Sequence, residues 1–469
     1  MKRYFFPAVF FLFAVNLYSV EFVESASPKS NSYVMYVNPC DFGPVVDKVV
    51  LYTEFLIGQE EVKPEDFDIT VYANPKDSVV VYGIVKGGRR VKEAYLSDET
   101  GNPSVQTTGH NITLWLEYSP DDELATPFND QKILDMEELY NYKITNQNLR
   151  ISITHRTAVV CKEVLKFKTD NFVYGEGSDE IKMNYASYVP EGTSSKIPLI
   201  VFFHGMGEVG KNIYMPLLKI KSTALAQSSI QKYFGEGAAV LIPQCPTGWM
   251  EITDLDPFGN RLWVVVDIGG TLNRVTAPVT NFLNKLFLMP ESEQVDRVVT
   301  PVSYYTLAAK DLIDKFIKEN PQIDKNRIYV GGCSAGGFMT VNMMLQYPDY
   351  FAAAFPICEA FPDTRINSRD LAKIAQKPMW FVLAKNDPTI DPEKNTIPTV
   401  NRLKKMGAKN LHYSYFDKVE DVTGKYFNAD KTAPHEYHGH DSWIYVFNDY
   451  VKDGGLSLFE WLASQTNSD

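Results

Sequence analysis

The sequence is poor in cysteine, and this scarcity excludes two kinds of small, cross-linked fold. Only five of its 469 residues are cysteines, namely Cys40, Cys161, Cys245, Cys333 and Cys358. Thiols so few and so widely spaced exclude a disulfide scaffold, and no C-x-x-C pair indicates a zinc site. In an oxidising compartment Cys40 and Cys161 could form a disulfide, and two buried free thiols are the alternative.

Positive charge is also in short supply. The chain has 46 Lys and Arg against 58 Asp and Glu, which gives a net charge of −12. This balance argues against nucleic acid or an anionic membrane surface as a partner, and it says nothing about oligomeric state.

The apolar run at the N-terminus, residues 4–15, is too short to cross a bilayer, which takes about 20 residues. It follows Lys2 and Arg3 and precedes Glu21, which is the order of a secretory signal peptide. We therefore expect residues 1–26 to be removed and the protein to be secreted or periplasmic, without stable membrane insertion afterwards. An uncleaved N-terminal anchor is the alternative.

The remaining chain is long enough for two domains, and its pattern changes near residue 170. Residues 27–170 contain short β-rich runs separated by turn signals such as Asn-Pro and Gly-Gly, which predicts an immunoglobulin-like β-sandwich. The expected strands are residues 48–55, 67–73, 78–85, 91–96, 112–117, 149–153 and 159–167.

Residues 171–469 instead alternate apolar strands with helical segments, which is typical of a mostly parallel sheet with helices on both faces. The expected strands are residues 183–189, 197–203, 238–243, 328–330, 351–357, 379–383 and 411–416. A helix is expected over residues 303–320, with Ser303 as its N-cap and Pro321 ending it. We classify this part as an α/β-hydrolase fold with an insertion at about residues 250–302.

The segment 331–337, Gly-Gly-Cys-Ser-Ala-Gly-Gly, lies between a strand-like and a helix-like run. This is the context of a G-x-S-x-G nucleophile elbow, in which Gly332 and Gly336 leave room for chain that passes close to Ser334. Ser334 is therefore the candidate nucleophile, and a glycine-rich turn with an incidental serine is the alternative.

A nucleophilic serine needs a base and a carboxylate, which follow it in the order Ser, acid, His in this fold. Asp387, just after the expected strand 379–383, is the candidate acid, with Asp391 as the alternative. Among His435, His438 and His440, the last is favoured because Gly439 precedes it and a helix-like run follows it. The H-x-x-H-x-H spacing could also indicate a metal site, but no cysteine or paired carboxylate completes one, so no metal is expected.

The oxyanion hole needs backbone donors, and the N–H groups of Ala335 and Met206 are the candidates, with Gly207 next. Met206 lies in the loop His204-Gly205-Met206-Gly207 after the most apolar strand, and His204 itself is expected to be structural. Four large aromatic residues, three of them in or next to the 250–302 insertion, could line a substrate pocket, and ordinary packing is the alternative. These residues are Trp249, Phe258, Trp263 and Tyr437.

Taken together, four segments of the second half resemble a known family. They are residues 201–208, 243–246, 323–337 and 439–443, and they look like the corresponding segments of secreted carboxylesterases of the polyhydroxybutyrate-depolymerase and prolyl-oligopeptidase-like branch. Residues 42–47 and 91–101 are similar to the immunoglobulin-like domain that precedes the hydrolase in esterases of the thermophilic EstA type. The resemblance implies the same nucleophile, acid and base as the residues themselves.

The expected activity is hydrolysis of carboxylic esters through an acyl-enzyme, with short to medium acyl chains or acylated plant polysaccharides as the expected substrates. No metal or organic cofactor is needed. Because the base must be neutral, activity should decline as pH falls through roughly 6 to 7. Two alternatives stay open, a secreted serine peptidase of prolyl-oligopeptidase type and a catalytically inactive protein that binds a surface or a polysaccharide.

Overall fold

The computed structural model describes residues 22–23, 29–73, 83–128, 139–177, 180–255, 261–264 and 300–467. For residues 253–255 and 261–264 the description covers the backbone. Most of the expected signal peptide and most of the expected insertion lie outside these residues. Of residues 1–26 only Phe22 and Val23 are described, and Phe22 is buried and pairs with Val159 of β9 (His155–Val160). No helix in the described ranges is both long and apolar enough to cross a membrane.

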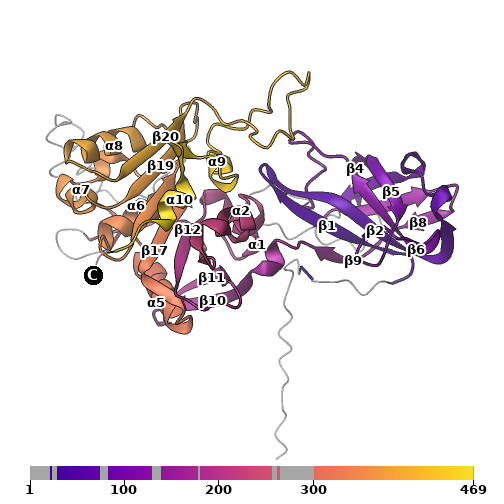
Figure 1. Ribbon diagram of the computed structural model, residues 1–469, viewed down its shortest axis with the longest axis horizontal. Helices are drawn as coiled ribbons and strands as arrows, with labels where there is room; N and C mark the ends of the chain where they lie inside the picture. Colours follow the sequence, from indigo (N-terminus) through magenta and orange to yellow (C-terminus); the bar gives the residue numbers. More distant parts are fainter. Residues whose placement is uncertain are drawn as a thin grey trace, which may run out of the picture.

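The N-terminal domain consists of two packed sheets, drawn in indigo and purple in Figure 1. The first has the order β5 (Val91–Leu96), β6 (Thr108–Leu116), β2 (Gly43–Gly58), β1 (Ser32–Cys40) and β9 (His155–Val160). The second has the order β4 (Ile84–Arg89), β3 (Asp68–Ala73), β7 (Asn141–Asn146) and β8 (Ile151–Ile153). Alternate residues such as Ile69, Val71 and Ile144 are buried between the sheets, as in a β-sandwich.

Two of the strands expected in this domain need comment. Most of the strand expected over residues 78–85 lies outside the described residues, and the described strand β4 begins at Ile84. The strand expected over 159–167 ends at Val160, and Val164–Lys166 forms a 3-10 turn instead. Strands β1 and β7 were not expected, because β1 directly follows the leader-like segment and β7 is rich in Asn and Lys.

The C-terminal domain is built on an eight-stranded sheet. Its order is β10 (Lys168–Tyr174), β11 (Ile181–Tyr188), β13 (Ala239–Gln244), β12 (Ile197–Phe203), β17 (Ile323–Cys333), β18 (Ala353–Ile357), β19 (Met379–Ala384) and β20 (Leu411–Phe416). The strands from β13 to β20 pair in parallel, whereas β10 and β11 pair antiparallel at one edge. The mostly parallel sheet predicted from the apolar strands is confirmed.

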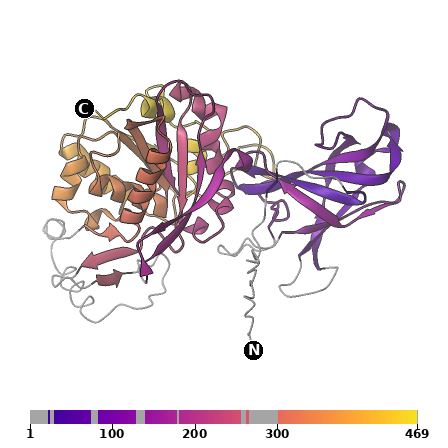
Figure 2. The same ribbon diagram turned by 90° about the horizontal axis from the view of Figure 1, so that it is seen from below.

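Helices cover both faces of this sheet (Figure 2). One face packs against α1 (Tyr214–Leu218), α2 (Ser228–Gln231), α9 (Trp443–Phe447) and α10 (Leu458–Ala463). The other packs against α5 (Thr306–Glu319), α6 (Ala335–Gln346), α7 (Ser368–Ile374) and α8 (Thr396–Lys405). Short strands β14 (Ile252–Leu255), β15 (Arg261–Val264) and β16 (Val302–Ser303) form a small sheet beside α5, and β21 (Lys452–Asp453) pairs with β22 (Leu456–Ser457).

Helix α5 begins later than expected, at Thr306, and Tyr305 occupies its N-cap position. Ser303 is therefore not the N-cap. Its hydroxyl donates to the Trp249 carbonyl at 2.7 Å and accepts from the Tyr305 N–H at 3.2 Å, so it joins β16 to the buried Trp249 segment. The helix ends at Glu319 before Pro321, as predicted.

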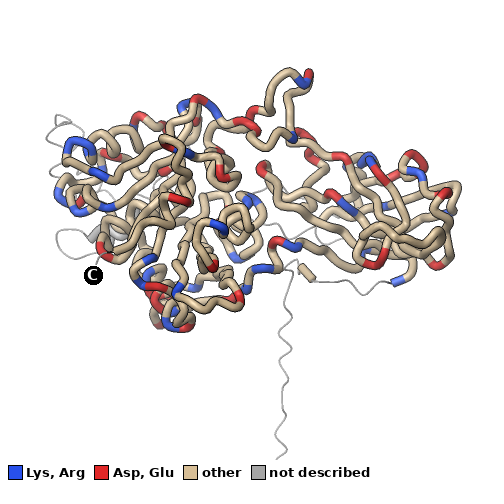
Figure 3. Tube along the Cα trace, viewed as in Figure 1, with Lys and Arg blue, Asp and Glu red and all other residues tan. Residues whose placement is uncertain are grey.

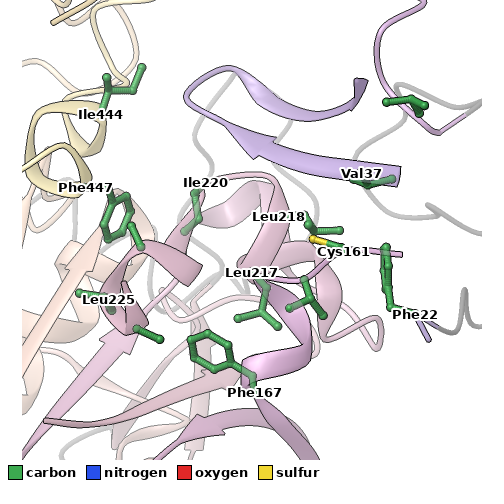
Figure 4. Close-up of a cluster of buried hydrophobic side chains, with 14 of the residues drawn as sticks. Phe22, Val37, Cys161, Phe167, Leu217, Leu218, Ile220, Leu225, Ile444 and Phe447 are labelled. Atoms are coloured by element: carbon green, nitrogen blue, oxygen red, sulfur yellow. The ribbon is translucent and has the colours of Figure 1, made fainter. Parts of the chain in front are cut away.

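The two domains share a continuous apolar core (Figure 4). Val37 and Cys161 of the N-terminal domain belong to the same buried cluster as Leu217 and Leu218 of α1. Cys40 and Cys161 are both buried free thiols and do not form a disulfide with each other. An interface of this apolar kind holds the domains in a fixed relation.

A second connection comes from residues 417–442, the segment between β20 and α9, which reaches toward the N-terminal domain at the top of Figure 1. Its Tyr426 ring meets the Phe42 ring edge-on, with centroids 5.2 Å apart. The Tyr426 hydroxyl donates to the Cys40 sulfur at 3.7 Å. The turn between β1 and β2, residues 40–43, is thus held between the two domains.

Candidate active site

Ser334 lies on a strained turn between β17 and α6. Its backbone angles are φ 57° and ψ −119°, a conformation that non-glycine residues rarely adopt. A Cβ on Gly336 would lie 2.0 Å from the Phe203 carbonyl oxygen, and one on Gly332 would lie 2.5 Å from the Gly336 carbonyl oxygen. The two glycines are therefore required by close backbone contact, which is the arrangement of a nucleophile elbow.

His440 and Asp387 come together although 53 residues separate them. The His440 Nδ1 atom is 2.7 Å from Asp387 Oδ2. Asp387 Oδ1 accepts from the N–H groups of Thr389 at 2.8 Å and Ile390 at 2.9 Å. The carboxylate is thereby held in one orientation. When the His440 ring is neutral, this carboxylate keeps the proton on Nδ1, which leaves Nε2 without one.

Gly439 explains how the histidine loop comes so close to the aspartate loop. A Cβ at this position would lie 2.2 Å from the Asn386 carbonyl oxygen, so only glycine fits. The neighbouring histidines are placed differently: His435 packs against Tyr437, and the His438 side chain is exposed. Asp391 is half-buried and pairs with Lys394 at 2.9 Å, whereas the carboxylate that contacts His440 is that of Asp387.

The environment of His440 favours its protonated form. Burial acts to lower the pKa of the ring, but the neighbouring Cys358 sulfur, which hydrogen-bonds to it, and the Asp387 carboxylate outweigh burial and raise the pKa. Cys358 follows β18 and has a strained φ of 36°. The Ser334 N–H donates to the carbonyl of Ile357, the residue before Cys358, at 2.9 Å. This hydrogen bond joins the strained turn at Ser334 to the strained turn at Cys358.

The loop at His204 is held on both sides of Gly205. His204 Nδ1 is 2.6 Å from the Gly205 carbonyl oxygen, and its Nε2 accepts from the Cys245 N–H at 2.9 Å, which places the proton on Nδ1. Burial lowers the pKa of His204 to about 4, so the ring is neutral. Because the C=O and N–H of one peptide point in opposite directions, holding the Gly205 carbonyl turns the Met206 N–H away from His204.

The other side of Gly205 faces a buried carboxylate. The Gly205 N–H donates to Glu208, whose pKa is raised by burial, and Lys219 Nζ lies 3.6 Å from Glu208 Oε1. Ala335 is the first residue of α6, so its N–H has no acceptor within the helix. Met206 lines the same cavity as Ser334, and Ala335 directly follows Ser334, so their N–H groups stay the candidate oxyanion donors.

A cavity of about 330 Å³ lies over Ser334 and His440. The N-terminal domain contributes residues 41–42 to its walls, and the hydrolase domain contributes residues 205–208, 219–220, 333–334, 389, 440–441 and 443. Phe42, Met206, Ile220 and Trp443 are its large apolar residues. Burial raises the pKa of Asp441, another lining residue, to about 6 against the opposing effect of His440 and His438.

Two of the aromatic residues expected at a substrate pocket are instead part of the packing. Trp249 is fully buried against Phe203 and His204, and Tyr437 is 7% exposed beside His435. Neither is among the described residues that line the cavity. The Trp263 side chain and Phe258 lie outside the described part of the structure.

Asp41 and Phe42 also line the cavity, and they were not among the predicted site residues. No local pattern marks them, because they approach Ser334 only after the domains dock. Trp443 lies in the segment 439–443 that pointed to His440, and its ring meets the His440 ring at 5.8 Å between centroids. The position of Trp443 three residues after the predicted base could therefore have marked it as a pocket residue.

Two family models match parts of the chain, one in each domain. Residues 32–165 match the model described as the esterase Ig-like N-terminal domain, and residues 309–361, which include Ser334, match the prolyl oligopeptidase family. The chain is an α/β-hydrolase with an N-terminal immunoglobulin-like (Ig-like) domain. It is thereby placed among the serine hydrolases, and the resemblance noted from the sequence is confirmed.

Individual relatives agree with this classification. A solved thermostable esterase aligns with 93% of this chain and 99% of its own, at 20% identity and a TM-score of 0.62, so this hydrolase shares the whole two-domain fold with it. The poly(3-hydroxyalkanoate) depolymerase C of Paucimonas lemoignei is 51% identical over 51 residues, which are 11% of this chain and 12% of the depolymerase. The match spans about an eighth of that relative.

Proposed function

We propose that this hydrolase is a secreted serine carboxylesterase that cleaves esters of short to medium acyl chains. The observation that carries the proposal is that Ser334, on its strained turn, and His440, paired with Asp387, line the same cavity. The Ig-like domain of esterase type and the partial likeness to a depolymerase support ester substrates over amides. Export rests on the leader-like N-terminus, and neither nucleic acid nor a membrane is proposed as a partner.

Each residue has one task in the proposed reaction. Ser334 Oγ attacks the ester carbonyl carbon as its proton moves to His440 Nε2, and Asp387 stabilises the imidazolium that forms. The N–H groups of Ala335 and Met206, with Gly207 as the next donor, stabilise the oxyanion. The C–O bond then breaks, and the alcohol leaves with the proton from His440.

Deacylation uses the same groups. Water attacks the acyl-enzyme while its proton passes to His440, and the bond between the acyl carbon and Ser334 Oγ breaks. The serine takes the proton back as the carboxylic acid leaves. No metal or organic cofactor takes part in either half of the proposed reaction.

The test is the Ser334→Ala variant, with Ser152→Ala as a matched control on the exposed face of β8. Hydrolysis of p-nitrophenyl acetate and butyrate should fall by on the order of a million-fold in the first variant and stay unchanged in the second. A fluorophosphonate probe should label the native protein and not the Ser334→Ala protein. Substantial residual turnover in Ser334→Ala would contradict the assignment.

A peptidase is the second candidate, because residues 309–361 match the prolyl oligopeptidase family and the cavity has Glu208 and Asp441 in its wall. Carboxylates so placed could bind a substrate amine. Rates on aminoacyl p-nitroanilides, measured beside those on p-nitrophenyl esters, separate the two activities. We expect ester turnover to exceed anilide turnover, and the reverse order would favour the peptidase.

A further inference from the structure

A second cavity, of about 390 Å³, opens between the two domains and is called the interface cavity below. The Ig-like domain contributes residues 38–41, 118 and 163, and the hydrolase domain contributes 221, 223–224, 227–229, 423, 425–426 and 447–448. Its volume lies within the range of small-molecule sites, and such sites are common between domains. None of the residues that act in the proposed ester hydrolysis lines this cavity.

The charges in the wall of the interface cavity are balanced. Asp41 and Glu163 supply two carboxylates, and Lys221 and Lys425 supply two ammonium groups. Lys221 Nζ lies 2.8 Å from Asp41 Oδ1, so one pair is already neutralised. A cavity without net charge favours a neutral ligand over an anion or a cation.

The other lining groups suit a ligand with many hydroxyls. Gln227, Ser228 and Ser229 contribute an amide and two hydroxyls at the start of α2, and both serines are exposed. Amides and hydroxyls donate and accept hydrogen bonds equally well, as sugar hydroxyls do. Tyr118 and Tyr426, with ring centroids 6.4 Å apart, add half-buried aromatic surface that can cover the apolar face of a sugar ring.

The interface cavity adjoins the cavity at Ser334. Asp41 lines both, and Asn448 in the wall of the interface cavity donates to Asp41 Oδ1 at 2.9 Å. Phe42, on the catalytic side, packs against Tyr426, on the interface side. A substrate with its ester carbonyl at Ser334 would therefore have its alcohol part within reach of the interface cavity.

We propose that the interface cavity binds a neutral sugar residue, and that it does so for the alcohol part of an acylated saccharide whose ester is cleaved at Ser334. The second half of the proposal rests on the proposed esterase activity, whereas the first half does not. The Ig-like domain, which supplies one wall, then takes part in choosing the substrate.

Binding is tested first, in the Ser334→Ala protein, so that turnover has no influence on the result. Titration calorimetry with xylo-oligosaccharides should detect binding, and galacturonic acid oligomers should bind at least about tenfold more weakly, because they carry charge into a neutral cavity. Adding Ser229→Trp should abolish binding by filling the cavity, and adding Ser152→Trp, at an exposed β8 position, should not. Thermal unfolding confirms that both variants are folded.

Turnover is tested second, in variants that retain Ser334. The ratio of KM for an acetylated xylo-oligosaccharide to KM for p-nitrophenyl acetate should rise about tenfold or more in Ser229→Trp and stay at the native value in Ser152→Trp, because only the saccharide ester reaches the interface cavity. Failure of all ester turnover, with saccharide binding intact, would overturn the esterase and keep the sugar site. No saccharide binding, tighter binding of the anionic oligomer, or binding unchanged by Ser229→Trp would each overturn the sugar site.

Discussion

The Asp41 carboxylate, at the tip of the β1–β2 turn, accepts a hydrogen bond of 2.8 Å from the Lys221 ammonium group 180 residues further along the chain. Asp41 is only 6% exposed, and Lys221 belongs to the hydrolase domain. This partly buried ion pair fixes the turn of the Ig-like domain at the rim of the cavity over Ser334. The neighbouring Phe42 ring is thereby placed in the wall of that cavity.

Replacement of Phe42 should change which acyl chains are accepted. Phe42→Ala removes a large apolar wall, so the cavity gains room, and the ratio of kcat/KM for p-nitrophenyl octanoate to that for the acetate should rise about tenfold. Phe55→Ala is the matched control, because Phe55 lies on the same strand pair and is 40% exposed. An unchanged chain-length profile in Phe42→Ala would show that the acyl group lies elsewhere.

His204 should act as a positioning residue for the Met206 N–H. In His204→Leu, which has no polar side-chain group, the Gly205 carbonyl loses its donor. The oxyanion peptide can then rotate, so kcat should fall by about tenfold to a hundredfold, with KM little changed. The acid limb of the pH profile should stay in place, since a ring with a pKa of about 4 is neutral throughout the pH range of that limb. His435→Leu is the control, and a rise in KM as large as the fall in kcat would indicate general damage to the site.

The chemistry near Ser334 could be read from the sequence because its determinants are local. The G-x-S-x-G spacing reflects the contacts of Gly332 and Gly336 with passing backbone, and those contacts depend on a few neighbouring residues. The same holds for Gly439, whose close approach to Asn386 selects His440 from three histidines. The alternation of apolar strands with helices is also a local pattern, and it was sufficient to predict the mostly parallel sheet.

The pocket could not be predicted, because it is formed by long-range packing. Asp41 and Phe42 reach the site only through the docked domains, and composition cannot distinguish an aromatic residue that lines a cavity from one that fills a core. Trp249 shows this, since it is fully buried against His204. Strand β1 was missed for a related reason: its burial depends on β2 and β9 rather than on its own alternation.

The pH profile should report the environment of His440. Its raised pKa means that the ring gains a proton at a higher pH than a free histidine does, so the acid limb of kcat/KM should have its midpoint above about 6.5. Cys358→Ala removes one of the groups that favour the imidazolium, and the midpoint should move to lower pH. Cys161→Ala, at a buried thiol in the other domain, is the control, and an equal shift in both variants would contradict a role for Cys358.

Glu359, just after Cys358, is a carboxyl group buried at 1% exposure. Its Oε2 accepts from the Phe361 N–H at 2.6 Å and its Oε1 from the Thr396 hydroxyl at 3.0 Å, and its Cβ packs against Gly337 of α6. Burial raises the pKa of Glu359 to about 7, against the opposing effect of these hydrogen bonds. The folded protein therefore keeps a proton that the unfolded chain has released.

Glu359 should make the folded protein less stable as pH rises. Between an unfolded pKa of about 4.5 and the folded pKa of about 7, only the folded state holds the proton, so stability falls with increasing pH by about 3 kcal/mol in total and is level above pH 7. Glu359→Gln cannot ionise, so its free energy of unfolding from urea titrations should lack this decline, and its advantage over the native protein should be larger at pH 8 than at pH 5. Glu54→Gln, at an exposed position of β2, should follow the native pH dependence. A decline in Glu359→Gln as steep as in the native protein would place the titrating group elsewhere, since removal of the carboxyl group leaves no proton at this position to lose.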